Sequence, residues 1–268
     1  MRANHILLAG MTALVLGGCA HQPADMNTGK QAYSDEDYDT AFAHYSELAK
    51  FGVPEAKTEL GRLYLSGRGT KADPAMALAL FEEAKQGGDS RAERYIPGAQ
   101  TKLGALTLNS KENTYNPQDG ITLLYKAAEK NDPNALFELG KAHEEGKGVP
   151  QNGKIADDYY ERSAALGYGR ADYSRGKLYE RGKLVPKNIP LALALYTQAG
   201  GRDYPRAWQQ LGKLYENGKE VPMDLKKASE FYTLAKLAGI DVTQDEARLK
   251  EKSGTPLTLG QLISDPTL

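Results

Sequence analysis

The stretch AWQQLGKLYENGKEVPMDLKKASEFYTLAKLAG, residues 207–239, contains two segments in which small and apolar side chains recur at helical spacing. In the first segment one helical face carries an alanine, a leucine, a glycine and a tyrosine: Ala207, Leu211, Gly212 and Tyr215. Glycines that can adopt positive φ follow this segment and would end the helix. The second segment begins near Asp224, and its Tyr and Ala side chains would pack back on the first. The stretch therefore predicts a pair of packed helices.

The same pattern recurs along the chain with a period of 36 residues. The glycines equivalent to Gly212 are 36 residues apart, with one earlier copy 43 residues before the first of them: Gly104, Gly140 and Gly176, and the earlier Gly61. Twenty residues after most of these glycines stands an aromatic side chain: Phe81, Tyr160, Tyr196 and Tyr232, with Tyr125 one place late. A glycine inside a helix costs about 1 kcal/mol relative to alanine, so we expect it to permit a close approach of the partner helix.

Repeated helix pairs with one apolar face can bury that face only by stacking on their neighbours. The sequence therefore predicts an all-α array over residues 29–252, with about five repeats and an N-terminal half-unit whose second helix is 39–52. Thr107 and Ser110 replace the usual Tyr and Gly in the second unit, and Pro97 lies nearby, so we expect a bend there. Residues 243–251 could form a capping helix, and residues 253–268 are expected to be a flexible tail.

The repeat pattern A-x-x-x-L-G-x-x-Y-x-x-G-x-G-V-x-x-D-x-x-K-A-x-x-x-Y-x-x-A-A-x-x-G resembles the Sel-one-like repeat (SLR), a longer relative of the tetratricopeptide repeat. The resemblance covers roughly Tyr38 to Gly239. It implies a right-handed α-solenoid of stacked helix pairs with a concave groove. It also implies a role as an adaptor or scaffold for protein complexes, without chemistry of its own.

The first eighteen residues have the pattern of a signal peptide. Arg2 is their only charged residue, and an apolar run from Ile6 to Leu16 follows it. The run ends in Leu16-Gly17-Gly18-Cys19, which resembles the lipobox of bacterial lipoproteins; the alternative is an ordinary signal peptide with a chance cysteine. The resemblance implies lipid attachment at Cys19, a tether over residues 19–28, and, because Ala20 replaces Asp, attachment to the periplasmic face of the outer membrane.

Composition and motifs narrow the classes of function. The chain has 34 Lys and Arg against 35 Asp and Glu, a net charge of −1, which argues against a nucleic-acid partner. A single cysteine excludes an intramolecular disulfide framework or a cysteine-based metal cluster. The glycine turns do not match a phosphate-binding loop, and His143-Glu144-Glu145 lacks the second histidine of a zinc-protease motif. We therefore predict no catalytic residues, no cofactor and no metal site.

The candidate partner-binding residues follow from their phase relative to the repeat glycine. In tetratricopeptide relatives the first helix of each unit lines the groove, and the equivalent places here carry charged, aromatic and amide side chains: Arg62, Lys141, Glu144, Arg170, Tyr173, Lys177, Glu180, Arg206, Gln209, Lys213 and Glu216. Each Lys lies three residues before a Glu, so the two can pair along one helical turn. These side chains are either a solvated, self-neutralised stripe or a ladder of charge that a peptide or a glycan could bind.

Three functions remain open from the sequence. The first is a lipid-anchored scaffold that binds protein partners in the cell envelope. A distant similarity to the lipoprotein scaffold of alginate export suggests a polysaccharide-export complex as one such partner. The second is a module that binds glycan or peptidoglycan. The third is a hydrolase like the cysteine-rich, β-lactamase-like relatives of this repeat, although no S-x-x-K motif is present.

Overall fold

The computed structural model describes residues 24–110 and 116–254. Every regular element in these ranges is a helix, and none of these helices has the length and apolar character that a membrane span requires. The predicted signal peptide, the lipid attachment at Cys19 and most of the predicted flexible tail lie outside the described residues.

Six successive helix pairs and one terminal helix make up the described chain. In the pairs, the first and second helices are α1 (Met26–Ser34) and α2 (Tyr38–Lys50), α3 (Pro54–Ser66) and α4 (Pro74–Gln86), α5 (Ile96–Asn109) and α6 (Pro117–Glu129), α7 (Pro133–Glu145) and α8 (Gly153–Ala165), α9 (Gly169–Arg181) and α10 (Ile189–Gly201), and α11 (Arg206–Asn217) and α12 (Leu225–Leu237). A short 3-10 helix, η1 (Ser90–Tyr95), precedes α5, and α13 (Thr243–Ser253) packs on α12.

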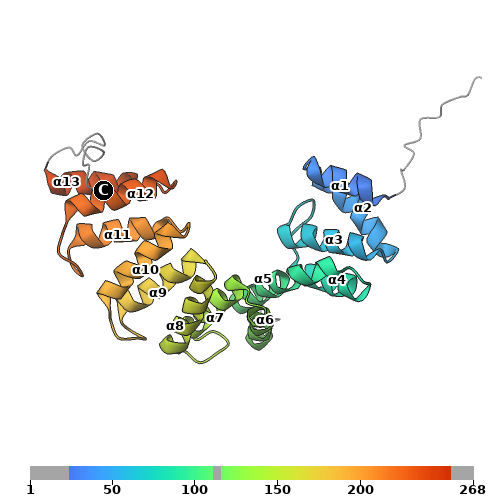
Figure 1. Ribbon diagram of the computed structural model, residues 1–268, viewed down its shortest axis with the longest axis horizontal. Helices are drawn as coiled ribbons and strands as arrows, with labels where there is room; N and C mark the ends of the chain where they lie inside the picture. Colours follow the sequence, from blue (N-terminus) through green and yellow to red (C-terminus); the bar gives the residue numbers. More distant parts are fainter. Residues whose placement is uncertain (1–23, 111–115, 255–268) are drawn as a thin grey trace, which may run out of the picture.

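The pairs stack on one another into an open arc (Figure 1). Helices α1 to α4 form one arm, α7 to α13 form the other, and α5 and α6 lie at the bottom between them. The first helices α3, α7, α9 and α11 end at glycines in the left-handed conformation, as the sequence predicts: Gly67, Gly146, Gly182 and Gly218. The structure confirms the predicted all-α solenoid of stacked helix pairs.

The repeat glycine and the aromatic side chain twenty residues later are in contact in each regular unit. A Cβ atom added at Gly140 would lie 2.7 Å from the ring of Tyr160, and one added at Gly212 would lie 2.5 Å from the ring of Tyr232. Both rings are buried. The glycine is therefore the residue that lets the second helix place its tyrosine against the backbone of the first, as expected from its cost inside a helix.

The N-terminal unit is a full helix pair rather than the expected half-unit. Helix α1 begins at Met26, inside the stretch predicted to be the tether, and Asp25 caps it by accepting a hydrogen bond of 2.9 Å from the backbone N–H of Thr28. A Cβ at Gly29 would lie 2.7 Å from the ring of Tyr45. The same glycine–tyrosine packing is present here at a shorter spacing, because only three residues separate α1 from α2.

In the second unit, the residue that packs against the repeat glycine differs from the one expected from the sequence. Leu124, not Tyr125, packs twenty residues after Gly104, and Leu124 is fully buried while Tyr125 is 38% exposed. A Cβ at Gly104 would lie 2.8 Å from the carbonyl oxygen of Gly120, so the backbones themselves approach closely. Residues 96–109, which include Pro97, form a regular helix, and the departure in this unit is the 3-10 helix that precedes it.

A buried carboxylate joins α3 to η1. Asp89 accepts hydrogen bonds from the Thr58 hydroxyl at 2.7 Å and from the Arg91 guanidinium at 2.8 and 2.9 Å. The bonds from Arg91, followed by the bond from Thr58, outweigh burial and lower the pKa of Asp89 to about 2. Ionised Asp89 therefore stabilises the folded chain.

We expect Asp89→Asn to lower the free energy of unfolding by about 2 kcal/mol at neutral pH. The pKa of Asp89 is lower in the folded chain than in the unfolded chain, and asparagine, which does not ionise, loses the stability that this difference contributes. A carboxyl whose folded-state pKa is depressed contributes stability above its unfolded pKa, and this is lost as the pH falls through the folded value. The gap between wild type and variant in urea unfolding should therefore close between about pH 4 and pH 2. Asp203→Asn at an exposed turn is the control. A gap that stays constant with pH would contradict the assignment.

Candidate partner-binding site

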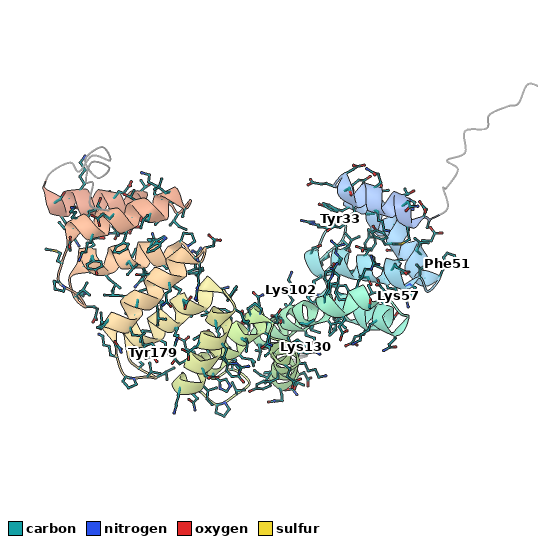
Figure 2. All side chains as sticks on the ribbon, in the orientation of Figure 1. Tyr33, Phe51, Lys57, Lys102, Lys130 and Tyr179 are labelled. Carbon is teal, nitrogen blue, oxygen red and sulfur yellow. The ribbon has the colours of Figure 1, made fainter. Side chains whose placement is uncertain are left out.

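The first helices of the units line the hollow of the arc. Lys102, two places before Gly104, lies toward the hollow, as does Tyr33 of the N-terminal unit (Figure 2). The predicted residues Tyr173 and Gln209 lie three places before their repeat glycines, Gly176 and Gly212, on α9 and α11. The predicted residues therefore lie on the helices that form the concave surface.

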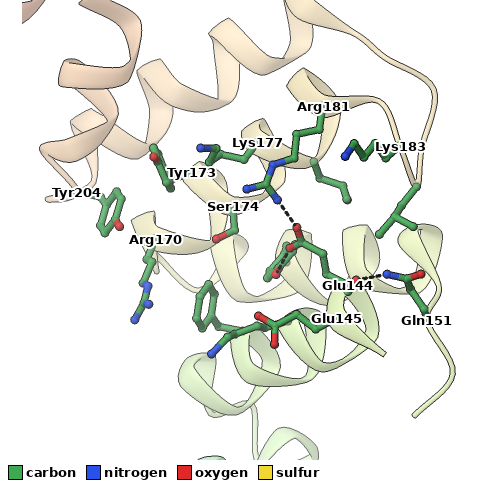
Figure 3. Close-up of a pocket in the computed structure, with 15 residues that line it drawn as sticks. Glu144, Glu145, Gln151, Arg170, Tyr173, Ser174, Lys177, Arg181, Lys183 and Tyr204 are labelled. Atoms are coloured by element: carbon green, nitrogen blue, oxygen red, sulfur yellow. Dashed lines mark hydrogen bonds and ion pairs between the residues drawn. The ribbon is translucent and has the colours of Figure 1, made fainter. Parts of the chain in front are cut away.

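A hollow of about 570 Å³ opens between α7 and α9 (Figure 3). It is called the α7/α9 pocket below. Tyr204, which precedes α11, closes one end, and the turns after α7 and α9 contribute Gln151, Lys183 and Leu184. The pocket brings together five of the predicted partner-binding residues: Lys141, Glu144, Arg170, Tyr173 and Lys177.

Aromatic rings form one wall of this pocket. The rings of Tyr173 and Tyr204 are 5.0 Å apart, and the guanidinium of Arg170 lies 4.8 Å from the ring of Phe137. Burial, and then the neighbouring Tyr204, raises the pKa of Tyr173, so its hydroxyl stays protonated. The wall combines flat apolar surface with hydroxyl groups that can donate hydrogen bonds.

Glu144 is engaged inside the array rather than presented to a partner. The Tyr160 hydroxyl donates to one carboxylate oxygen at 2.7 Å, and the Arg181 guanidinium binds the other at 3.0 Å (Figure 3). Burial of Tyr160, and the nearby carboxylate of Glu144, raise the pKa of that tyrosine. Glu144 thus connects its own first helix to the second helix of its unit and to the first helix of the next.

The same junction recurs at Glu180 and Glu216. Glu180 accepts from the Tyr196 hydroxyl and from the Gln210 amide, the latter at 3.0 Å. Glu216 accepts from the Tyr232 hydroxyl at 2.5 Å and pairs with the Lys252 ammonium at 3.1 Å. Its side chain is 2% exposed. The repeated glutamates therefore hold neighbouring units together.

The predicted pairing of each lysine with the glutamate three residues later is wrong. Lys141 lies 3.8 Å from Glu138, and Lys213 lies 3.9 Å from Asp245. The ammonium of Lys177 faces the ring of Tyr173 at 5.9 Å. The glutamates are taken by tyrosine hydroxyls and by side chains of the next unit or of α13, so none of the three lysines pairs with the glutamate three residues after it.

The remaining candidates lie outside the α7/α9 pocket. Arg62 sits between the rings of Tyr33 and Tyr95, at 5.0 and 5.6 Å, and pairs with Glu59. The amide of Gln209 donates to Asp245 of α13 at 2.6 Å. Arg206 is exposed at the start of α11.

The described residues show no group of three or more His, Cys, Asp and Glu side chains that could hold a metal ion. His143 is buried and stacks on Tyr159 with ring centroids 5.7 Å apart, in the place that Tyr179 and Tyr215 occupy in the later units. It stacks on an aromatic ring of the second helix of its unit, as Tyr215 does on Phe231.

Comparisons with known proteins agree with this architecture. The family model described as Sel1 repeat matches residues 54–89, 97–132, 133–168, 169–204 and 209–246. The chain is similar to the crystal structure of a Sel1 repeat protein from Oxalobacter formigenes, with a TM-score of 0.64 and 26% identity, covering 91% of this chain and 94% of that one.

Two further proteins are similar to this chain, one with a lower TM-score and one over about half of the chain. A protective antigen of uropathogenic Escherichia coli that displays an SLR fold gives a TM-score of 0.54 at 23% identity, covering 84% of this chain and 55% of that one. An uncharacterized protein of Neisseria meningitidis is 31% identical over 128 residues, which are 48% of this chain. The matched region spans about a quarter of that relative's length.

Proposed function

Because the chain belongs to the Sel1 repeat family, whose members mediate protein–protein interactions, we propose that it is a non-catalytic scaffold anchored by lipid to the periplasmic face of the outer membrane. The observation that carries the scaffold role is the α7/α9 pocket on the concave side of a rigid helical stack. Stacked units present a long preformed surface, which suits the capture of an extended segment of another protein.

The proposed membrane location rests on the sequence alone. Leu16-Gly17-Gly18-Cys19 has the residues of a lipobox at the end of a signal-peptide pattern. Several acyl chains on one cysteine would anchor a protein stably, whereas a single chain would not. We propose cell-envelope proteins as partners, including a polysaccharide-export complex, on the strength of the similarity to the alginate-export scaffold.

Replacing Cys19 by alanine tests the anchor. We expect wild-type protein made in a bacterial host to incorporate labelled palmitate and to fractionate with membranes, and Cys19→Ala to lose both properties. A palmitate label that survives in the variant would refute attachment at Cys19. The repeat array should fold identically in both, because residue 19 lies outside the helix pairs that the structure describes, the first of which begins at Met26.

In-cell photo-cross-linking tests the scaffold role. A benzophenone amino acid in place of Ser174 should give a protein adduct in mass spectrometry, because this side chain lines the α7/α9 pocket. The control places the same group at the exposed Lys219. Adducts to glycan strands in place of protein would favour a glycan-binding module, and equal adducts at both positions would contradict a partner in this pocket.

A further inference from the structure

The α7/α9 pocket has a marked excess of positive charge in a chain whose net charge is −1. Its lining includes five cationic side chains and two carboxylates: Lys141, Arg170, Lys177, Arg181 and Lys183 against Glu144 and Glu145. Like charges gathered in a hollow repel one another, and a negatively charged ligand relieves that repulsion.

Both carboxylates are already paired, and two of the five cations, Arg181 and Lys141, have carboxylate partners of their own. Glu144 pairs with Arg181 at 3.0 Å, and Glu145 pairs with Lys147 at 2.6 Å. Within the described ranges, no carboxylate lies at ion-pair distance from Arg170, Lys177 or Lys183, and the first two face aromatic rings instead. Three cations in one hollow thus remain available to an anion from outside the chain.

The spacing of these cations fits an extended chain. Arg170 and Lys177 lie seven residues apart on α9, which separates them by about 10 Å along the helix axis. Ser174 lies between them on the same face. An extended peptide advances about 3.3 Å per residue, so two carboxylates about three residues apart would reach both cations.

The rest of the lining favours a peptide over an acidic glycan. Tyr173, Leu184 and Tyr204 are half-buried and give the pocket an apolar wall beside its charges. A peptide can bear apolar side chains beside its carboxylates, whereas an acidic polysaccharide has carboxylates on hydroxyl-bearing sugar rings and no apolar side chains. Aromatic and arginine side chains in a concave site are effective anchors for a protein partner.

We propose that the α7/α9 pocket binds an extended acidic segment of a partner protein, with carboxylates on Arg170 and Lys177 and apolar side chains against Tyr173 and Tyr204. This rests on the proposed scaffold function and specifies the chemistry of the partner. Lys183, on the turn after α9, extends the positive surface at the Lys177 end.

The test selects a phage-displayed random-peptide library on the immobilised full chain. We expect the selected peptides to be enriched in Asp and Glu, with apolar residues between them. A variant with Arg170→Gln, Lys177→Gln and Lys183→Gln should bind the selected peptides about tenfold more weakly or worse, because it loses three charge contacts. Added salt should weaken binding to the wild type and have less effect on the variant.

The matched control changes three exposed lysines outside the pocket, Lys71→Gln, Lys154→Gln and Lys219→Gln, and removes the same total charge. It should retain binding. A second variant, Lys177→Gln with Lys183→Gln, keeps the contact of Arg170 with Phe137 in case the triple change perturbs folding.

Selected peptides without acidic enrichment, or equal loss in the pocket and control variants, would overturn the proposal. Binding of polygalacturonate that depends on the same three cations, with no peptide selected, would assign the pocket to an acidic glycan instead. If the in-cell protein adducts at position 174 persist while peptide selection shows no acidic preference, the scaffold function stands and only the partner chemistry is wrong.

Discussion

Replacing Gly212 by valine should lower the free energy of unfolding by about 3 kcal/mol. Any side chain at this position places a Cβ 2.5 Å from Cε1 and 2.6 Å from Cδ1 of Tyr232. The ring cannot swing aside, because it is 1% exposed and its hydroxyl is bound to Glu216 at 2.5 Å. The two helices of the last unit would have to separate, and apolar contacts along their whole interface would be lost.

The control for this change is Gly98→Val. Gly98 is also helical, in the first turn of α5, but a Cβ added there has no atom within 4 Å. Valine has a somewhat better helix propensity than glycine, so this variant should be as stable as the wild type or slightly more stable. Thermal and urea unfolding of both variants give the comparison. Equal stability of Gly212→Val and wild type would mean that the glycine is not required for helix packing.

Replacing Glu216 by alanine should also lower the free energy of unfolding by about 3 kcal/mol, because it leaves the buried Tyr232 hydroxyl without an acceptor. It also leaves Arg248 and Lys252 without their shared carboxylate, at 3.4 and 3.1 Å in the folded chain. These two cations belong to α13, so that helix should loosen first. Hydrogen exchange of amides in residues 243–253 measures this effect separately from global unfolding.

The dependence of this effect on pH has a defined sign. Burial acts to raise the pKa of Glu216, but hydrogen bonds from Tyr232, Lys252 and Arg248 outweigh it and hold the pKa below its usual value. The stability that Glu216 contributes is therefore present above its unfolded-state pKa and is lost as the pH falls through the lower folded value. Glu251→Ala at an exposed site of α13 is the control and should stay within about 0.5 kcal/mol of wild type. Unchanged protection of α13 in Glu216→Ala would contradict the docking role.

The sequence predicted the helix pairs from α3 to α12 because apolar periodicity is a local property of the chain. It missed α1 because Gly29 precedes Tyr45 by 16 residues, not the 20 found in later units. The glycine and tyrosine still meet, since a shorter turn between the helices compensates for the shorter spacing. The sequence also predicted Tyr125 as the buried residue of the second unit, because the other units have an aromatic residue near this place. Leu124 is buried there instead.

The sequence also contains a correlation that predicts the glutamate junctions, although the place of each glutamate relative to the repeat glycine does not show it. In the three units from α7 to α12 the buried aromatic has a hydroxyl, and the residue four places after the repeat glycine is a glutamate: Glu144 with Tyr160, Glu180 with Tyr196 and Glu216 with Tyr232. The N-terminal unit does not follow this pattern, since Tyr33 stands four places after Gly29. Where the hydroxyl is absent, that place holds leucine: Leu65 with Phe81 and Leu108 with Leu124. The hydrogen bonds explain the rule, because a buried hydroxyl requires an acceptor and a phenyl or leucyl side chain does not.

The amino-acid sequence by itself determined the helices, their pairing and their stacking, since a stripe of small and apolar side chains is buried only when copies of the pair pack together. Only the tertiary structure decided which charges remain free for a partner. Glu144 is neutralised by Arg181 of the next unit, while Arg170 and Lys177 meet aromatic rings. Ion pairs depend on distances between side chains of different helices, and the spacing of residues within one helix does not specify those distances.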